Sequence, residues 1–253
     1  MKKILLICIV IIFILFVIAF NNSNPKNVIA KLNNLDVLQP KELRYRVYLF
    51  GVFPVGEALL TFEKIEDYNG EKLYHLNASA ESLKILSKIF SGSVILDSYV
   101  NVNDLNPILF KEKLSVTGKE SVEKEVFYDQ KNNIMLSKGV ERKIFPNTQD
   151  PLSAIFRIRR MDLNSIRDFE LNLNTNQKNY LLQASVAQNE FFVRNKLFKT
   201  SCVKANIRRS DKNNRYHRSN MDIVFLKGKE NIPILIKVFA SGVLINVKLV
   251  EGE

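Results

Sequence analysis

The sequence predicts a mainly β fold, in which a long antiparallel meander curls into one or two open barrel-like sheets with two short helices on the concave side. Three observations support this fold class. From residue 41 onward, apolar and polar residues repeatedly alternate with period two, and turn-forming residues separate the alternating segments at intervals of about 8 to 14 residues. Only two stretches of this region change to helical spacing. A parallel doubly wound fold would instead need buried strands separated by long helices.

The alternating segments can be followed in order along the chain. In the first, Leu43, Tyr45 and Val47 share one face, while Arg44 and Arg46 share the other. The same period recurs over residues 43–49, 74–80, 94–102, 110–116, 169–173, 180–186 and 243–249. Turn-forming residues predict hairpins at 69–70, 117–119, 130–133, 176–177, 227–229 and 241–242.

The stretch 82–90 is the first that breaks the period. Leu83, Leu86 and Phe90 recur at helical spacing, and Gly92 closes the run. We therefore expect a short helix between two strands. An apolar helix lying across the concave face would cover what the curl of a long sheet leaves open.

The stretch 150–163 is the second, and it has the sharpest start signal in the chain. Asp150 can cap the first free N–H groups, and Pro151 suits the first helical position, where its missing N–H has no intrahelical partner to lose. The residues that then share one helical face are Leu152, Ile155, Phe156 and Arg159. We expect a helix buried by that face.

Arg159 ends this apolar face with a charge. A buried guanidinium needs hydrogen-bond partners or access to water. We expect Arg159 to anchor the helix to strand carbonyls or to a carboxylate, with contact to a ligand as the alternative. Arg157 and Arg160 are expected to point outward.

The N-terminus has the composition of an export segment. Lys2 and Lys3 precede Ile4–Phe20, a run of seventeen uncharged apolar residues that ends abruptly at polar residues. This length is slightly long for a signal peptide and short for a spanning helix, so residues 1–20 are either a cleaved signal peptide or a membrane anchor. The lysines place the rest of the chain outside the cytoplasm, in the periplasm or cell envelope. Residues 21–40 then form a polar tether.

Composition indicates a single folded domain over residues 41–250. The 253-residue chain is 46% hydrophobic, and a domain of this size buries enough surface to be stable as a monomer. The net charge of +11 favours anionic partners such as a membrane surface or a cell-wall polymer, and the export segment argues against nucleic acid. Of the two cysteines, Cys8 lies in the N-terminal apolar run, so Cys202 has no partner for an internal disulfide.

Two distant segments of the chain share a short sequence string, which suggests an internal repeat. Residues 107–111 and 233–237 share the string Pro-Ile-Leu-x-Lys. Two related meanders, 41–139 and 168–250, would explain the match. The preference for proline at the start of a strand is the alternative explanation.

Three stretches carry a resemblance to a known family. They are Val126–Asp129, reading VFYD, Asp150–Arg159, reading DPLSAIFRIR, and Met221–Phe225 ahead of Pro233. In this order they resemble the landmarks of an uncharacterised bacterial family of exported proteins, domain of unknown function 3108. The chain departs from that pattern at 164–165, where a glycine is replaced, and in a plainer strand at 221–225. The resemblance implies an exported β domain and no particular reaction.

Residue types that carry catalysis form no recognisable pattern in the sequence. The two histidines, His75 and His217, lie in no nucleophile motif, and His75 is expected to be exposed on a strand. Glu123 and Glu125 share one strand face without a feature that would mark them as an acid and base pair. Metal-ligand spacings and glycine-rich phosphate loops are absent from the sequence. We therefore expect no enzymatic activity, no metal and no cofactor.

A basic segment is the clearest surface signal. It reads RRSDKNNRYHR over residues 208–218. Its cations are either a solvated hairpin or a contact for anionic lipid head groups or glycan. The candidate contact residues are Arg208, Arg209, Lys212, Arg215 and Arg218.

Two functional hypotheses remain, from different classes. In the first, the domain is a non-catalytic module that binds a lipid or another hydrophobic envelope molecule inside a half-barrel, by analogy with half-barrel lipoprotein carriers of the periplasm. In the second, it is a structural or protein-interaction domain tethered to the inner membrane, and its own side chains fill the concave side. The candidate cavity residues are Leu83, Leu86, Phe90, Leu152, Ile155, Phe156 and Arg159. The volume they leave free decides between the two.

Overall fold

The computed structural model describes residues 24–31, 42–68, 70–86, 91–193, 195–210, 218–228 and 231–252. The predicted export segment lies outside these ranges, as does most of the predicted tether. Within them, no helix combines the length and apolarity needed to cross a bilayer.

The described chain consists mostly of strands. In order, its elements are α2 (Pro25–Lys31), β1 (Glu42–Leu49), β2 (Phe53–Tyr68), β3 (Glu71–Ser82), the 3-10 turn η1 (Lys84–Leu86), β4 (Gly92–Asn101), β5 (Pro107–Val116), β6 (Val122–Asp129), β7 (Ile134–Ser137), β8 (Val140–Lys143), α3 (Pro151–Arg160), β9 (Asp168–Thr175), β10 (Lys178–Val193), β11 (Lys196–Arg209), β12 (Arg218–Leu226), β13 (Ile232–Ala240) and β14 (Val243–Gly252).

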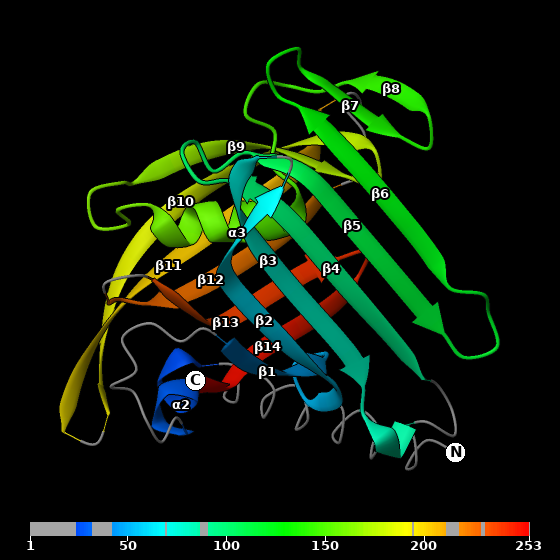
Figure 1. The fold of residues 1–253 in the computed structure, drawn as a ribbon. Coiled ribbons are helices and arrows are strands. Elements are labelled where there is room, and N and C mark those ends of the chain that lie inside the picture. Colours follow the sequence, from blue (N-terminus) through cyan, green and yellow to red (C-terminus); the bar gives the residue numbers. More distant parts are fainter. Residues whose placement is uncertain are drawn as a thin grey trace.

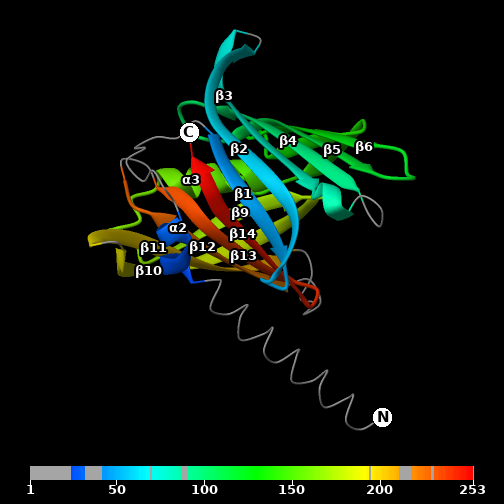
Figure 2. The same ribbon diagram turned by 90° about the horizontal axis from the view of Figure 1, so that it is seen from below.

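The strands of the described residues form one 14-stranded sheet with the order β8-β7-β6-β5-β4-β3-β2-β1-β14-β13-β12-β11-β10-β9. Every ladder is antiparallel, and the first and last strands, β1 and β14, pair in the middle of the sheet. The sheet curls around α3, which lies on its concave side (Figures 1 and 2). The predicted mainly β fold with an open, barrel-like sheet is confirmed.

The two edges of the sheet, β8 and β9, are joined by the chain that connects β8 to α3. Gln149 makes an isolated parallel bridge to β9, where its N–H donates to the Asn172 carbonyl and its carbonyl accepts from the Asn174 N–H, both at 2.8 Å. The side chain of Asn179 also donates to the Lys143 carbonyl at 3.0 Å. These bonds cover part of the β9 edge, which would otherwise present unpaired backbone groups.

The predicted turns explain the tight connections. Asn176 and Gln177 both have positive φ, 50° and 58°, and so do Ser241 and Gly242, at 50° and 80°. Two successive residues of this kind give the hairpin turn whose twist matches the flanking strands. Gly118 has φ 76° between β5 and β6. The predicted turns at 176–177 and 241–242 are therefore confirmed.

The prediction of a helix that starts at residue 82 is wrong. Ser82 is the last residue of β3 and pairs with Gly56, and the Leu83 N–H donates to the Val55 carbonyl at 3.0 Å. Pairing with β2 therefore continues through the first residues of the expected helix. Only the single turn η1 follows, and residues 87–90 lie outside the described ranges.

Part of the predicted tether belongs instead to the folded domain. Residues 25–31 form α2, which contacts β10, β13 and β14. Its Val28 and Ile29 are buried in the same apolar cluster as inner residues of the sheet. The domain therefore begins before residue 41, because these two apolar side chains are removed from water by packing.

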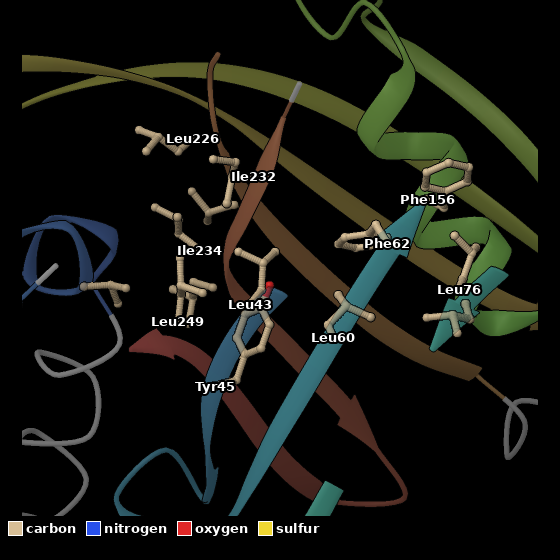
Figure 3. Packing of buried hydrophobic residues seen from close by; sticks show 14 of the residues in the cluster. Leu43, Tyr45, Leu60, Phe62, Leu76, Phe156, Leu226, Ile232, Ile234 and Leu249 are labelled. Carbon is tan, nitrogen blue, oxygen red and sulfur yellow. The ribbon is translucent and has the colours of Figure 1, made fainter. Parts of the chain in front are cut away.

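The largest core cluster of the described residues surrounds α3 and runs to α2. Leu152 and Phe156 join residues of β1–β4 and β12–β14 in it, and Figure 3 shows Phe62 and Leu76 close to Phe156. Ala154 and Ile158, on another side of the same helix, join a second cluster with β9–β12. The helix thus packs between the two halves of the curled sheet. The two meanders of the suggested repeat lie on either side of the β1–β14 pair, and their relationship stays a prediction.

Candidate functional site

The start of α3 has the geometry that its sequence predicts. The Asp150 Oδ1 accepts hydrogen bonds from the Leu152 and Ser153 N–H groups at 2.8 and 2.9 Å. The Ser153 hydroxyl in turn accepts from the Asp150 N–H at 2.9 Å, which completes a reciprocal capping box with Pro151 as the first helical residue. The Ser98 hydroxyl donates to Asp150 Oδ2 at 2.6 Å. One carboxylate therefore caps the helix and ties it to β4.

Burial controls the electrostatics of this cap. Asp150 is fully removed from solvent, and this burial raises the pKa of its carboxyl, although the bonds from Ser98 and from the helix N–H groups act in the opposite direction. The pKa of Tyr128 is also raised well above its usual value, first by burial and then by the charge of Asp150. The positive end of the helix dipole is the compensating charge nearby.

A polar layer extends from the cap to the neighbouring loop. The Gln149 side chain donates to Asn106 Oδ1 at 3.0 Å, and Arg157 Nη1 donates to the same oxygen and to the Asp104 carbonyl, both at 3.3 Å. Arg157 is therefore half-buried against the β4–β5 loop. The prediction that it points outward is wrong. These bonds fix the loop to the helix.

The predicted apolar face of α3 is filled by packing. Leu152 is 3% exposed and Phe156 is fully buried. The Phe156 ring lies 6.0 Å from the Phe62 ring and 5.4 Å from the Tyr74 ring. Ile155 is only partly buried and packs with the second cluster. The helical candidate cavity residues thus form core contacts with the sheet.

Arg159 takes the anchoring position that the sequence predicts. It is 2% exposed, its Nε donates to the Asn231 carbonyl at 3.2 Å, and its guanidinium lies 4.3 Å from the centre of the Phe62 ring. Asn231 returns a bond from its side chain to the Arg159 carbonyl at 2.9 Å. The positive charge of Arg159 also lowers the pKa of the Tyr45 hydroxyl, which burial raises by a larger amount. Arg160 is exposed as predicted.

Of the other candidate cavity residues, the two that the structure describes lie away from this face. Leu83 and Leu86 are half-buried, and neither belongs to the buried clusters around α3. Phe90 lies outside the described residues. The single turn η1 is too short to form an apolar stripe that could reach across the sheet.

The basic segment is described only at its two ends. Arg208 and Arg209 end β11, and Arg218 begins β12 opposite Arg208. Lys212 and Arg215 lie outside the described residues. The ladder thus pairs the backbones of Arg208 and Arg218 at one end of the β11–β12 hairpin.

The outer face of the sheet carries a polar cluster that the sequence did not predict. His75 of β3 lies between two carboxylates, with Nδ1 3.1 Å from Glu66 and Nε2 2.8 Å from Asp97. The Asn77 amide donates to Asp97 at 2.8 Å, and the Tyr99 ring stacks on the imidazole at 4.5 Å. The His75 side chain is 20% exposed, so the expectation of a simple exposed histidine is wrong. Register alone brings these residues together, because they come from three different strands.

The two carboxylates favour the imidazolium form of His75. The hydrogen bond to Asp97 is the largest of the effects that raise the histidine pKa, and the same bond lowers the pKa of Asp97. In the imidazolium form, both ring nitrogens donate to these carboxylates. Among the described residues, no three metal-ligating side chains form a cluster that could hold an ion.

Asp97 also lines a groove of about 820 Å³ on the outer face over β4–β7. Charged pairs border it, with Lys111 bonded to Glu125 at 3.1 Å and Lys113 to Glu123 at 2.8 Å. Each glutamate is thus engaged by its own lysine. The apolar side chains of the groove are Ile95, Phe127 and Leu136.

A family model described as "Protein of unknown function (DUF3108)" matches residues 44–242. The chain belongs to the DUF3108 family. The three landmarks that suggested it lie on β6, on α3 with its cap, and on β12, so they mark the central helix and strands of both halves of the sheet.

One solved structure resembles this DUF3108 protein in fold. It is described as a beta-barrel-like protein of domain of unknown function DUF1849 from Brucella abortus. The two share 12% sequence identity with a TM-score of 0.57, over 85% of this chain and 97% of the other. At this identity the likeness concerns the fold alone. No curated protein matches the chain.

Proposed function

We propose that this DUF3108 protein is a non-catalytic structural or protein-interaction domain of the cell envelope, tethered to the inner membrane by residues 1–20. In this role its own side chains fill the concave side of the sheet, and partners bind on the outer surface. The apolar run after Lys2 and Lys3 supports the tether.

The packing of α3 is the observation that supports this proposal over a lipid carrier. Leu152, Phe156 and Arg159 are at most 3% exposed, and they occupy the space that a hydrophobic ligand would need. Protein interiors are packed closely enough that a drug-sized ligand needs a cavity of roughly 300 Å³ or more. To admit such a ligand, α3 would have to move away from the sheet. That movement would break the bond between Ser98 and Asp150 in the core.

The outer groove over β4–β7 is the surface we propose for a partner. Its apolar residues are exposed to a similar extent, between 38% and 41%, and alternating charges surround them. A mixture of this kind suits a protein segment with both apolar and charged side chains better than an acyl chain. The His75 cluster holds Asp97 in position at one end of the groove.

Native mass spectrometry of the full-length protein in mild detergent tests the filled interior. We expect the bare protein mass in every preparation and no lipid recovered after solvent extraction. A lipid bound in a fixed one-to-one ratio would contradict the proposal if it resists detergent exchange. Its loss in a Leu152→Phe variant would place that lipid beside α3 and support the carrier hypothesis.

A further inference from the structure

The hairpin of β10 and β11 reaches beyond its neighbours. The two strands pair from Tyr180 with Arg209 to Val193 with Lys196, whereas the ladder with β9 ends at Ser185. The ladder of β11 with β12 begins only at Thr200. Within the described chain, residues 191–198 therefore form a two-stranded ribbon without a strand on either side.

The two faces of this ribbon differ in burial. Phe191 and Phe198 are directly opposite each other and pack against the large core cluster that also contains Val28 of α2. Phe192 and Leu197 form the next pair and are 68% and 43% exposed. An isolated ribbon is only marginally stable, so one docked face holds it while the other presents an aromatic and an aliphatic side chain to the surroundings.

The position of α2 relates this ribbon to the membrane, and this step rests on the proposed tether. The predicted anchor ends at Phe20, and α2 begins at Pro25. Five residue steps span at most about 18 Å of extended chain. Because α2 contacts β10, an anchor that ends at Phe20 would hold the bilayer on the side of the domain where the ribbon lies. Figures 1 and 2 both show α2 beside the β10–β11 hairpin.

The charges next to the exposed pair match an anionic lipid surface. Lys196 and Lys199 are exposed on the ribbon, and the contact of Lys199 with Glu190 is a weak surface pair at 3.8 Å. Basic residues attract acidic head groups, while aromatic and aliphatic side chains insert into the head-group boundary. The basic segment at Arg209 is at the other end of β11, roughly 43 Å away along the strand.

We propose that the end of the β10–β11 hairpin, where Phe192 pairs with Leu197 and Lys196 and Lys199 flank Leu197, inserts into the interface of an anionic lipid bilayer and orients the tethered domain on the membrane. The opposite end of β11, at Arg208 and Arg209, then faces away from that membrane. The sequence left two explanations open for residues 208–218, a solvated hairpin or a contact for anionic lipid head groups or glycan, and the proposal agrees with the solvated hairpin.

The absence of tryptophan from the chain allows a direct test. Full-length Phe192→Trp is reconstituted in vesicles of phosphatidylglycerol and phosphatidylcholine with brominated acyl chains. Full-length Ile65→Trp is the matched control, because Ile65 is also exposed but lies on β2 near its turn to β3. We expect blue-shifted emission and at least twofold quenching for Phe192→Trp only, with less quenching when phosphatidylglycerol is left out.

The outcomes separate the two proposals. Protein that floats with the vesicles while both tryptophans stay unquenched would overturn the hairpin contact and leave the tether intact. Protein that fails to float would overturn the tether and, with it, the hairpin contact. Blue-shifted emission of Phe192→Trp that the brominated acyl chains do not quench would assign Phe192 to a protein interface instead, and so would also contradict the proposal.

Discussion

Replacing Asp150 by alanine is the sharpest test of how α3 is held inside the sheet. The substitution removes the cap, which contributes about 1 kcal/mol at a helix start. It also leaves the buried Ser98 hydroxyl without its acceptor in a dry environment, which costs about 1 to 3 kcal/mol. We expect Asp150→Ala to lower the free energy of unfolding by about 3 kcal/mol.

Asp150→Asn separates the hydrogen bonds from the charge. The amide oxygen can still accept from the Leu152 and Ser153 N–H groups, and the Ser98 hydroxyl can rotate to accept from the amide nitrogen. We therefore expect a loss of less than about 1 kcal/mol for this variant. Asp129→Ala is the control, because Asp129 makes similar local bonds to Asn132 at an exposed turn.

The assay is urea denaturation of the full-length protein in mild detergent, followed by circular dichroism. An Asp150→Ala variant as stable as Asp129→Ala would refute the reasoning, and so would an Asp150→Asn variant as unstable as Asp150→Ala. The pH dependence adds a second readout. Because burial raises the folded pKa of Asp150, the folded state retains its proton longer, and wild-type stability falls as pH rises from 3.8 through that folded pKa. Asp150→Asn should lack this decrease.

Substitutions at three further positions test other parts of the structure by the same denaturation assay. Arg159→Met keeps the packing on the Phe62 ring without a buried charge and should cost less than about 1.5 kcal/mol, whereas Arg159→Ala leaves a cavity and should cost about 2 to 4 kcal/mol. His75→Gln should destabilise most below pH 6.5, and the difference from wild type should shrink as pH rises through the raised folded pKa of His75. Gly56→Ala should cost about 1 to 3 kcal/mol, because the added methyl would lie 2.6 Å from the carbonyl oxygen of Glu81.

Equal stability of Arg159→Met and Arg159→Ala would contradict the packing role of the arginine stem. A His75→Gln effect that stays constant with pH would show that the carboxylates do not hold an imidazolium. A Gly56→Ala protein as stable as wild type would mean that β2 and β3 can separate at this point without loss.

Features that depend on a few neighbouring residues were predicted well. The cap at Asp150 needs only the residues of the first helical turn, and the alternation of the strands is visible within five residues. The turn at Asn176–Gln177 belongs to the same class, since two residues that tolerate positive φ determine its type. The helix expected from residue 82 failed because the ladder to Gly56 persists through Ser82, a pairing that helical spacing does not reveal.

The outer cluster shows why the candidate site could not be predicted. His75 and Asp97 are 22 residues apart and look like ordinary polar positions on separate strands. Only the register of β3 with β4 makes them neighbours, and a shift by one residue would send one of them to the other face.

The sequence by itself determined the mainly β class, the start of the central helix and the family, because side-chain periodicity and capping act over a few residues. Only the tertiary structure decided that Leu152, Phe156 and Arg159 of α3 pack inside the curled sheet, that residues 25–31 join the core and that His75 meets two carboxylates. These outcomes depend on contacts such as the bond from the Tyr45 hydroxyl to the Pro233 carbonyl, across 188 residues of chain. Contacts at that separation follow from strand order and register, which no local pattern specifies.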